Sequence, residues 1–253
     1  MELGLKGKSA IVTGGAKGIG AAISEGFAKE GARVAVCYRS DPERCEAFIQ
    51  GLRDTYGIEC IGVRGDLGHP ETVMEIYDRV QEAFGACADI LVNNAGGAKT
   101  TALTDISLEE WNNTLQGNVT ATMYMSREFA RRAIQVGKGG KIVNILSKVA
   151  VSATSKNRTC YVVNKTAELG LTRQLAVDLV EHGIIVNGVL PGLVITELNR
   201  DMPTLPAKEA RMPKKRAILP GEIADTTVYL ASDRAEAMVG SLVDCSGGLL
   251  LGF

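Results

Sequence analysis

The chain has 253 residues and a mass of 26.8 kDa, which is enough for one large hydrophobic core. Hydrophobic residues make up 45% of it and only 7 residues are proline, a composition that argues against disorder. The formal net charge of −1, with one short basic run at residues 213–216, argues against nucleic acid as a partner. The first residues lack the apolar stretch of a signal peptide, and no apolar run reaches membrane-spanning length. We therefore expect a soluble, cytoplasmic protein with no membrane partner.

Short, continuously apolar segments alternate with helical patterns along the whole sequence. Predicted strands cover residues 10–13, 33–38, 60–64, 90–93, 141–146, 184–190 and 242–244. Predicted helices cover residues 18–30, 42–56, 70–84, 108–136, 158–181 and 221–232. Continuous apolar runs are typical of strands that are covered on both faces. The pattern predicts an α/β protein, a doubly wound, Rossmann-like three-layer sandwich with a parallel sheet, in a single domain over residues 1–253.

A glycine-rich turn follows the first predicted strand. In Gly14-x-x-x-Gly18-x-Gly20 the glycines allow a sharp turn and bring backbone N–H groups close to a pyrophosphate at the helix N-terminus. Lys17 and Ile19 lie within the same turn. A lone glycine motif could be a simple tight turn, but its place between a strand and a helix favours dinucleotide binding.

The end of the second predicted strand, Tyr38-Arg39-Ser40, indicates which dinucleotide binds. A carboxylate there would bond the adenosine ribose and repel a 2′-phosphate, but the first acid is Asp41. Arg39 is able to pair with that phosphate, with Lys17 and the Ser40 hydroxyl within reach. We therefore expect NADP in preference to NAD; the alternative is that Arg39 is a solvated surface side chain.

Tyr161 and Lys165 stand four residues apart in the predicted helix 158–181, so they share one face of it. An ammonium group beside a phenol favours the phenolate, which lets a tyrosine exchange protons near neutral pH. Such pairs arise by chance on many helix surfaces. This one gains weight from the glycine turn about 150 residues upstream.

Two segments fall outside the alternation of strands and helices. Residues 196–219 contain three prolines and mixed charge, and we interpret them as a lid over a substrate. The apolar C-terminal residues 245–253 would be costly to expose, so we expect them at a subunit contact or in the core.

Cysteine and histidine patterns exclude other chemistries. The six cysteines include no Cys-x-x-Cys pair, so no metal site is predicted. His69 precedes a predicted helix start and His182 a predicted helix end, and both are interpreted as structural. Hydrolysis by a Ser-His-Asp triad therefore has little support.

One ordered set of motifs runs through essentially the whole chain. It comprises Thr13-Gly14-x-x-x-Gly18-x-Gly20, Asp66-Leu67, Asn93-Asn94-Ala95-Gly96, Asn118, Ser147, Tyr161-x-x-x-Lys165 and Pro191-Gly192-x-x-x-Thr196. The set resembles the single-domain branch of the short-chain dehydrogenase/reductase family. That resemblance implies a seven-stranded Rossmann sheet, a homotetramer or homodimer, and hydride transfer between a nicotinamide and a carbonyl or alcohol.

The resemblance also implies a role for each residue. Tyr161 would give a proton to the carbonyl oxygen or take one from the alcohol, and Lys165 would support the phenolate and hold the nicotinamide ribose. Ser147 would polarise the carbonyl, and Asn118 would position a water that feeds protons to Lys165. Taken alone, Asn118 is an ordinary helix residue and Ser147 a turn former.

The cofactor residues that we expect come from the same motifs, with 66–67 against the adenine and 191–196 against the nicotinamide. They are Gly14, Lys17, Gly18, Ile19, Gly20, Tyr38, Arg39, Ser40, Asp66, Leu67, Asn94, Ala95, Gly96, Tyr161, Lys165, Pro191, Gly192, Val194 and Thr196.

The sequence also departs from the family pattern around the tyrosine. Ser147 lies fourteen residues before Tyr161, where the family usually has thirteen, which indicates a one-residue insertion in the loop 148–160. Residues 149–158 are polar and either meet a hydroxylated or anionic substrate or form a solvated loop. The residues after the tyrosine, Val162-Val163-Asn164, are bulkier than usual.

A last departure concerns the substrate. Val177 stands in a helix where relatives that reduce acyl-carrier-protein thioesters commonly carry an arginine. We therefore favour an NADP-preferring oxidoreductase of a small carbonyl or secondary alcohol, such as a ketone, sugar, polyol or hydroxy acid. The alternatives are a β-ketoacyl-acyl-carrier-protein reductase and a dinucleotide-binding regulator without turnover. A complete set of catalytic residues argues against the regulator, which needs no proton donor.

Overall fold

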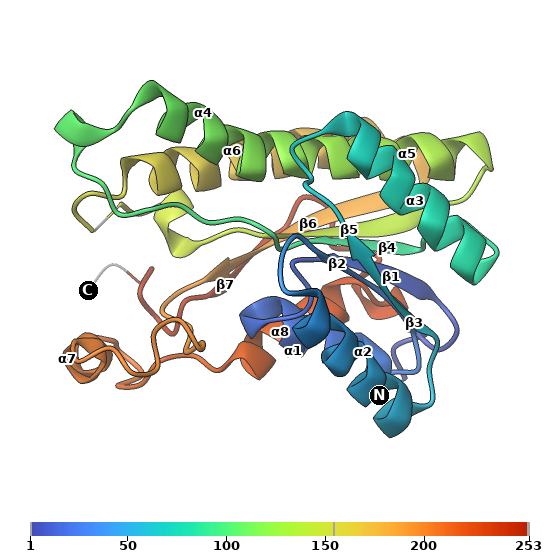
Figure 1. The fold of residues 1–253 in the computed structure, drawn as a ribbon, viewed down its shortest axis with the longest axis horizontal. Coiled ribbons are helices and arrows are strands. Elements are labelled where there is room, and N and C mark those ends of the chain that lie inside the picture. The colour runs from blue at the N-terminus through green and yellow to red at the C-terminus, as the bar shows by residue number, and fades with distance from the viewer. Residues whose placement is uncertain (1, 154, 252–253) are drawn as a thin grey trace.

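A computed structural model describes residues 2–153 and 155–251 and shows a single seven-stranded sheet (Figure 1). The strands are β1 Ser9–Thr13, β2 Arg33–Tyr38, β3 Cys60–Arg64, β4 Ile90–Asn93, β5 Gly140–Ile145, β6 Ile184–Pro191 and β7 Leu242–Cys245. Their order is β3-β2-β1-β4-β5-β6-β7, and every neighbouring pair is parallel. The predicted fold class, a doubly wound Rossmann-like sheet, is confirmed.

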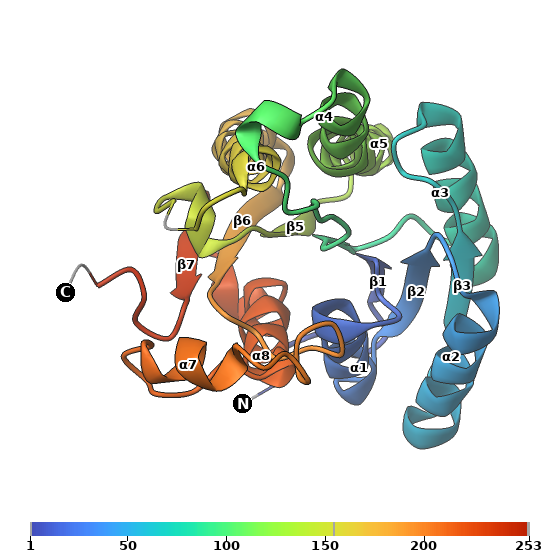
Figure 2. The same cartoon turned by 60° about the vertical axis from the view of Figure 1, so that its left-hand side comes forward.

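Helices cover both faces of the sheet. They are α1 Gly18–Lys29, α2 Pro42–Tyr56, α3 Pro70–Phe84, α4 Leu108–Leu115, α5 Ala121–Gln135, α6 Thr159–Leu179, α7 Leu205–Ala210 and α8 Pro220–Leu230. Figure 2 shows α1, α2 and α8 on one side of the strands and α3, α5 and α6 on the other. Among the described residues, no helix combines the length and apolar character needed to cross a membrane.

The sheet is buried on both faces, and this explains the continuous apolar runs in the sequence. Val12 and Phe27 belong to a hydrophobic cluster between the sheet and the α1–α8 layer, whereas Ile11 and Phe129 belong to a cluster on the opposite face. Successive side chains of a strand point to opposite faces. A strand between two helical layers is therefore buried along its whole length: all five residues of β1 are buried, and the three central ones, Ala10 to Val12, are apolar.

The predicted helix 108–136 is in fact two helices joined by a π-helical turn, η2 Gln116–Thr120. The Asn118 side chain explains the break. Its Nδ2 donates to the carbonyl of Thr114 at 2.6 Å, the acceptor that the backbone amide of residue 118 would use in an α-helix. The side chain also bonds both backbone groups of Gly97, so a tertiary contact holds the wider turn.

Backbone hydrogen bonds join the two ends of the segment 196–219. Ile218 accepts from the Ile195 amide at 2.9 Å and donates to the Leu193 carbonyl at 2.8 Å, which brings the two ends of the segment together. Between them the chain forms α7, whose Leu205 is buried. The lid function of this segment remains a prediction.

The apolar C-terminal end is only partly covered. Leu249 and Leu250 pack against hydrophobic clusters, whereas Leu251 is 63% exposed. The final two residues of the expected buried segment, 252–253, lie outside the described part of the chain. The core therefore accounts for some of this apolar surface.

One buried carboxylate, Glu128 of α5, binds two arginines of the same helix and should make stability depend on pH. Glu128 accepts from Arg131 at 2.7 and 2.9 Å and from Arg132 at 2.7 Å, and these bonds, Arg131 first, lower its pKa from 4.5 to about 2. Because the folded-state pKa is depressed, the stabilisation is present above the unfolded value and is lost as pH falls toward 2.

Glu128→Gln should therefore lower the free energy of unfolding by about 3 kcal/mol at neutral pH. Denaturant unfolding of the variant and of the original chain between pH 7 and about 2.5 measures the difference, which should shrink steadily over the acid end of that range. A difference that stays constant with pH would contradict this assignment.

Candidate active site

The strand order reverses beside β1, because the chain moves outward to β2 and β3 and then returns to place β4 on the other side. In open parallel sheets a crevice forms at the carboxyl ends of the strands at such a point. A cleft of about 1010 Å³ lies here, lined by the turn after β1, the ends of β2 and β4, and residues of α4, η2 and α6. Its position and size suit a dinucleotide.

The glycine turn is shaped so that side chains are excluded from its inner surface. Gly14 has a φ of 61°, and a Cβ there would lie 3.2 Å from the Asn94 side chain. A Cβ on Gly20 would collide with the Gly14 carbonyl oxygen and lie 2.5 Å from Asn94 Nδ2. Gly18, with a φ of 53°, faces Thr196, which brings the start of the 196–219 segment against the turn. The residues thus form a bare backbone cradle of the kind that a pyrophosphate requires.

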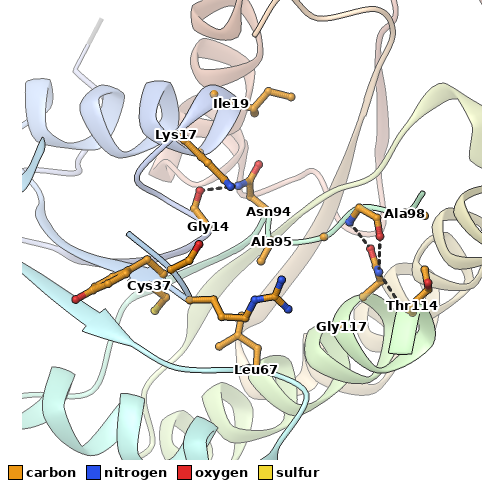
Figure 3. Close-up of a pocket in the computed structure, with 18 of the residues that line it drawn as sticks. Gly14, Lys17, Ile19, Cys37, Leu67, Asn94, Ala95, Ala98, Thr114 and Gly117 are labelled. Carbon is orange, nitrogen blue, oxygen red and sulfur yellow. Dashed lines mark hydrogen bonds between the residues drawn. The ribbon is translucent and has the colours of Figure 1, made fainter. Parts of the chain in front are cut away.

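Thr13 and Asn94 bind the ends of β1 and β4 together beside this cradle. Asn94 Nδ2 donates to the Thr13 carbonyl at 2.9 Å and to the Gly14 carbonyl at 3.3 Å, and Figure 3 shows Asn94 against Gly14. In return, Thr13 Oγ1 accepts from the amides of Asn94 and Ala95, both at 2.9 Å. These bonds fix the floor of the cleft before any ligand is present.

Charged side chains gather at the end of the cleft formed by β2 and β3. Arg39 is 76% exposed, and its Nη1 lies 3.8 Å from an oxygen of Asp66. An ion pair this exposed and this long contributes little, so the guanidinium can exchange its partner. Sequence reasoning placed both residues at the cleft but did not pair them.

A second ion pair in this region was not predicted. Arg44, in α2, donates to both oxygens of Glu197 at 2.7 and 2.6 Å, and both residues line the cleft. The bond from Arg44 holds the pKa of Glu197 below its ordinary value. The two residues are 153 positions apart, so no local pattern could have indicated the pair.

Most residues predicted to bind the cofactor line this one cleft. They are Gly14, Lys17, Gly18, Ile19, Gly20, Tyr38, Arg39, Ser40, Asp66, Leu67, Asn94, Ala95, Gly96, Lys165 and Thr196. Pro191, Gly192 and Val194 do not line it. Gly192 has another reason to be glycine, since a Cβ there would lie 2.5 Å from the Ser246 carbonyl oxygen.

Asn118 and Lys165, two of the four predicted catalytic residues, also line the cleft, and both side chains are buried. Ser147 lies two residues after the end of β5 and is buried, and its Oγ accepts from the Val149 amide at 3.3 Å. Tyr161 precedes Lys165 by one turn of α6, so the two share a helix face. Neither Ser147 nor Tyr161 is among the residues that line the cleft.

Arg158 covers the ring of Tyr161. Its guanidinium carbon lies 4.4 Å from the ring centroid, and Nη1 donates to Thr100 Oγ1 at 3.1 Å. A cation over an aromatic face is attracted by the ring quadrupole. Arg158 therefore adds positive charge beside the tyrosine, a feature that sequence reasoning included only within a polar loop.

Two acceptors, one on β5 and one on α6 itself, hold the Lys165 ammonium group in place. Its Nζ donates to the Ile145 carbonyl at 2.9 Å and to Glu168 Oε2 at 2.7 Å. The Lys165 and Glu168 side chains are only 7% and 3% exposed. Glu168 was not predicted as a site residue, although its place three residues after Lys165 is a signal that the sequence contains.

The cradle, the charged β2 end and the Tyr-x-x-x-Lys helix define a nicotinamide-dinucleotide oxidoreductase of the Rossmann class. The chain belongs to the short-chain dehydrogenase/reductase family. A family model described as Enoyl-(Acyl carrier protein) reductase matches residues 14–250.

Known proteins similar to this chain include sugar, polyol and acyl-thioester enzymes. A glucose and ribitol dehydrogenase homolog from Oryza sativa subsp. japonica is 35% identical, over 98% of this chain and 87% of the relative. A 3-oxoacyl-[acyl-carrier-protein] reductase FabG from Aquifex aeolicus is 31% identical, over 98% and 100%. The crystal structure of L-sorbose reductase from Gluconobacter frateurii, complexed with NADPH and L-sorbose, is 32% identical and covers both chains fully with a TM-score of 0.92.

Proposed function

We propose that this protein is an NADP(H)-dependent oxidoreductase that interconverts a small polyhydroxylated ketone or aldehyde and the corresponding alcohol. The observation that carries the proposal is that Lys165 and Asn118 line the same cleft as the glycine cradle and Arg39. This arrangement would put the nicotinamide end of a bound dinucleotide beside α6 and its adenosine end beside β2. The bare cradle fits such a cofactor, because its shape requires glycine: side chains at Gly14 and Gly20 would press on Asn94 and on the backbone that forms the turn.

Each of the four proposed catalytic residues has its own role in the mechanism. The bound nicotinamide supplies or accepts a hydride. Tyr161 donates a proton to the substrate oxygen during reduction and removes it during oxidation, while Lys165 stabilises the phenolate. Ser147 bonds the same oxygen and orients it, and Asn118, whose side chain is fixed between Thr114 and Gly97, holds the π turn next to Lys165.

The proposed substrate class rests on the relatives and on charge around the tyrosine. Sugar and polyol enzymes are among the relatives, and the L-sorbose reductase structure shares the full length of the fold. Arg158 and the polar residues near it offer donors to substrate hydroxyl or carboxylate groups. A ketose, a sugar acid or a polyol would use such donors, whereas a plain ketone would leave them unpaired.

A panel of ketoses, aldoses, polyols, hydroxy acids and simple ketones, assayed by the absorbance of NADPH, tests the proposal. We expect reduction of at least one hydroxylated carbonyl with a kcat/KM well above that of a simple ketone of similar size. Turnover confined to simple ketones or to thioesters would contradict the substrate class.

The NADP preference should depend on Arg39. Arg39→Ala removes the guanidinium that would pair with the 2′-phosphate, so we expect kcat/KM with NADPH to fall about 10- to 100-fold. The value with NADH should stay within about twofold, because that cofactor has no phosphate to lose. Equal losses with both cofactors would mean that Arg39 acts on the fold and does not select the cofactor.

The second candidate is reduction of an acyl-carrier-protein thioester, favoured by the FabG relatives. Val177, which stands where such relatives commonly carry an arginine, is 70% exposed and offers no charge to an acidic carrier. Including a β-ketoacyl thioester in the panel, free and carrier-bound, discriminates between the two substrate classes.

A homotetramer is part of the proposal. Val163 and Val177 on α6, and Val180 just after it, are exposed apolar side chains that a subunit contact would cover.

A further inference from the structure

A buried acid–base pair, Lys165 and Glu168, follows the proposed proton donor, Tyr161, by one to two turns of α6. Glu168 Oε2 accepts from Lys165 Nζ at 2.7 Å, and both side chains are almost fully buried. The other carboxylate oxygen, Oε1, is buried without a hydrogen-bond partner among the described residues. Burial of a half-satisfied carboxylate is costly, and replacement by an apolar residue would remove that cost. Its presence behind Lys165 calls for a reason other than stability.

Lys165 is the charged group that affects the pKa of Glu168. Burial raises the pKa of Glu168, and the Lys165 ammonium opposes that rise. On the elements packed against α6, β6 and η2 carry no titratable residue. The charged and titratable residues on the other packed elements are Glu109 and Glu110 on α4, Tyr124, Arg127, Glu128, Arg131 and Arg132 on α5, Lys141 on β5, Lys148 on η3 (Lys148–Ala150), and Glu181 and His182 on η4 (Val180–His182).

These other groups have contacts of their own. Glu110 accepts from Thr101, Tyr124 stacks with Arg127, Glu128 binds two arginines, and Lys141 binds Glu236. Lys148, which also interacts elsewhere, is not a cause of the shift at Glu168. Lys165 is the only charged group among the causes of the pKa shift at Glu168.

We propose that Glu168 is a positioning residue that balances the charge of Lys165 and thereby opposes loss of a proton from the Tyr161–Lys165 pair. The site is thereby set to donate a proton to a carbonyl oxygen. This inference rests on the proposed function, in which reduction transfers one proton from Tyr161 to the substrate oxygen and solvent replaces it.

The direction of the effect follows from the net charge of the three groups. With the tyrosine protonated, Tyr161, Lys165 and Glu168 together carry no net charge, and loss of a proton leaves a buried site with a charge of −1. With a neutral residue in place of Glu168, the same step takes the site from +1 to zero. In a poorly solvated site, proton loss that ends at zero charge is easier than proton loss that ends at −1. The site should therefore lose its proton more readily without the Glu168 charge, whichever of the two coupled groups, Tyr161 or Lys165, releases it.

Glu168→Gln tests the proposal because glutamine keeps the shape and the acceptor oxygen but removes the charge. In the pH profile of kcat/KM for reduction with NADPH, the alkaline limb, where activity falls as pH rises, should move to lower pH by about one unit. The KM for NADPH should change less than kcat at pH 8. Glu168→Asp, which restores the charge, should return the limb toward its original position. A limb that stays in place or moves to higher pH in the glutamine variant overturns the proposal.

A second readout needs no substrate and separates this inference from the proposed function. The ultraviolet absorbance of tyrosinate is titrated for the original chain and for Glu168→Gln, each against its own Tyr161→Phe counterpart. The difference isolates Tyr161 from the other five tyrosines. A lower midpoint in the glutamine variant supports the inference even if no tested carbonyl is reduced, and an unchanged midpoint overturns it.

Glu128→Gln is the matched control for both readouts. It also neutralises a buried glutamate bound to basic side chains, but one that binds Arg131 and Arg132 of α5 and not Lys165. General loss of stability would affect both variants. A limb shift of the same size in this control would show that Glu168 acts through the fold alone.

Discussion

Replacing Tyr161 by phenylalanine should lower kcat about a thousandfold while the affinity for NADPH changes by less than about threefold. The ring stays in place, so its stacking with Arg158 is retained, but the group that exchanges a proton with the substrate is lost. Stopped-flow or steady-state rates of NADPH consumption measure kcat, and fluorescence titration of bound NADPH measures affinity.

Tyr229→Phe serves as the control. Tyr229 is a partly exposed residue of α8 whose hydroxyl donates to the Arg234 carbonyl at 3.5 Å, away from the cleft. Its variant should keep full activity. If Tyr161→Phe retained the biological activity of the chain in cells, the regulator hypothesis would gain over the enzyme hypothesis. If it retained turnover in the purified protein, Tyr161 would not be the proton donor.

Gly20→Ala should weaken NADPH binding by a factor of about 100 or more and lower the free energy of unfolding by about 1–3 kcal/mol. The added methyl group would occupy the place of the Gly14 carbonyl oxygen and press on Asn94, whose side chain fixes the cleft floor. Neither neighbour can yield cheaply, because both are tied to β1 and β4. Fluorescence titration and thermal melting report the two effects separately.

Gly51→Ala is the matched change for comparison. Gly51 lies within α2, and a Cβ there would meet nothing within 4 Å. Since alanine favours a helix, this variant should be more stable by about 0.5–1 kcal/mol and should bind NADPH normally. Unimpaired cofactor binding in Gly20→Ala would contradict the role of the bare cradle.

The parts of the fold that depend on local pattern could be predicted from the sequence. The apolar run of β1 and the glycines after it specify a buried strand followed by a turn without side chains, and the structure has both. The helix 108–136 shows where this reasoning stops. Its break depends on the bond between Asn118 and Gly97, which come from different parts of the chain.

The candidate site shows the same limit. Arg39 and Asp66 follow adjacent strands, so their proximity could be expected once the pairing of Tyr38 with Arg64 is known. The bond between Arg44 and Glu197 depends on how the 196–219 segment folds back, and no local pattern contains that information. Glu168 differs from both, because its spacing from Lys165 is local and only its burial needed the structure.

Deuterium transfer from NADPH that carries deuterium at both C4 positions of the nicotinamide to the carbonyl carbon of a sugar or other hydroxylated ketone tests the central claim most directly. Mass spectrometry of the alcohol product should show one deuterium per molecule with the original chain, and Tyr161→Phe should form this labelled alcohol about a thousandfold more slowly. NADPH that binds the cleft but passes no deuterium to any carbonyl in the panel would contradict the account.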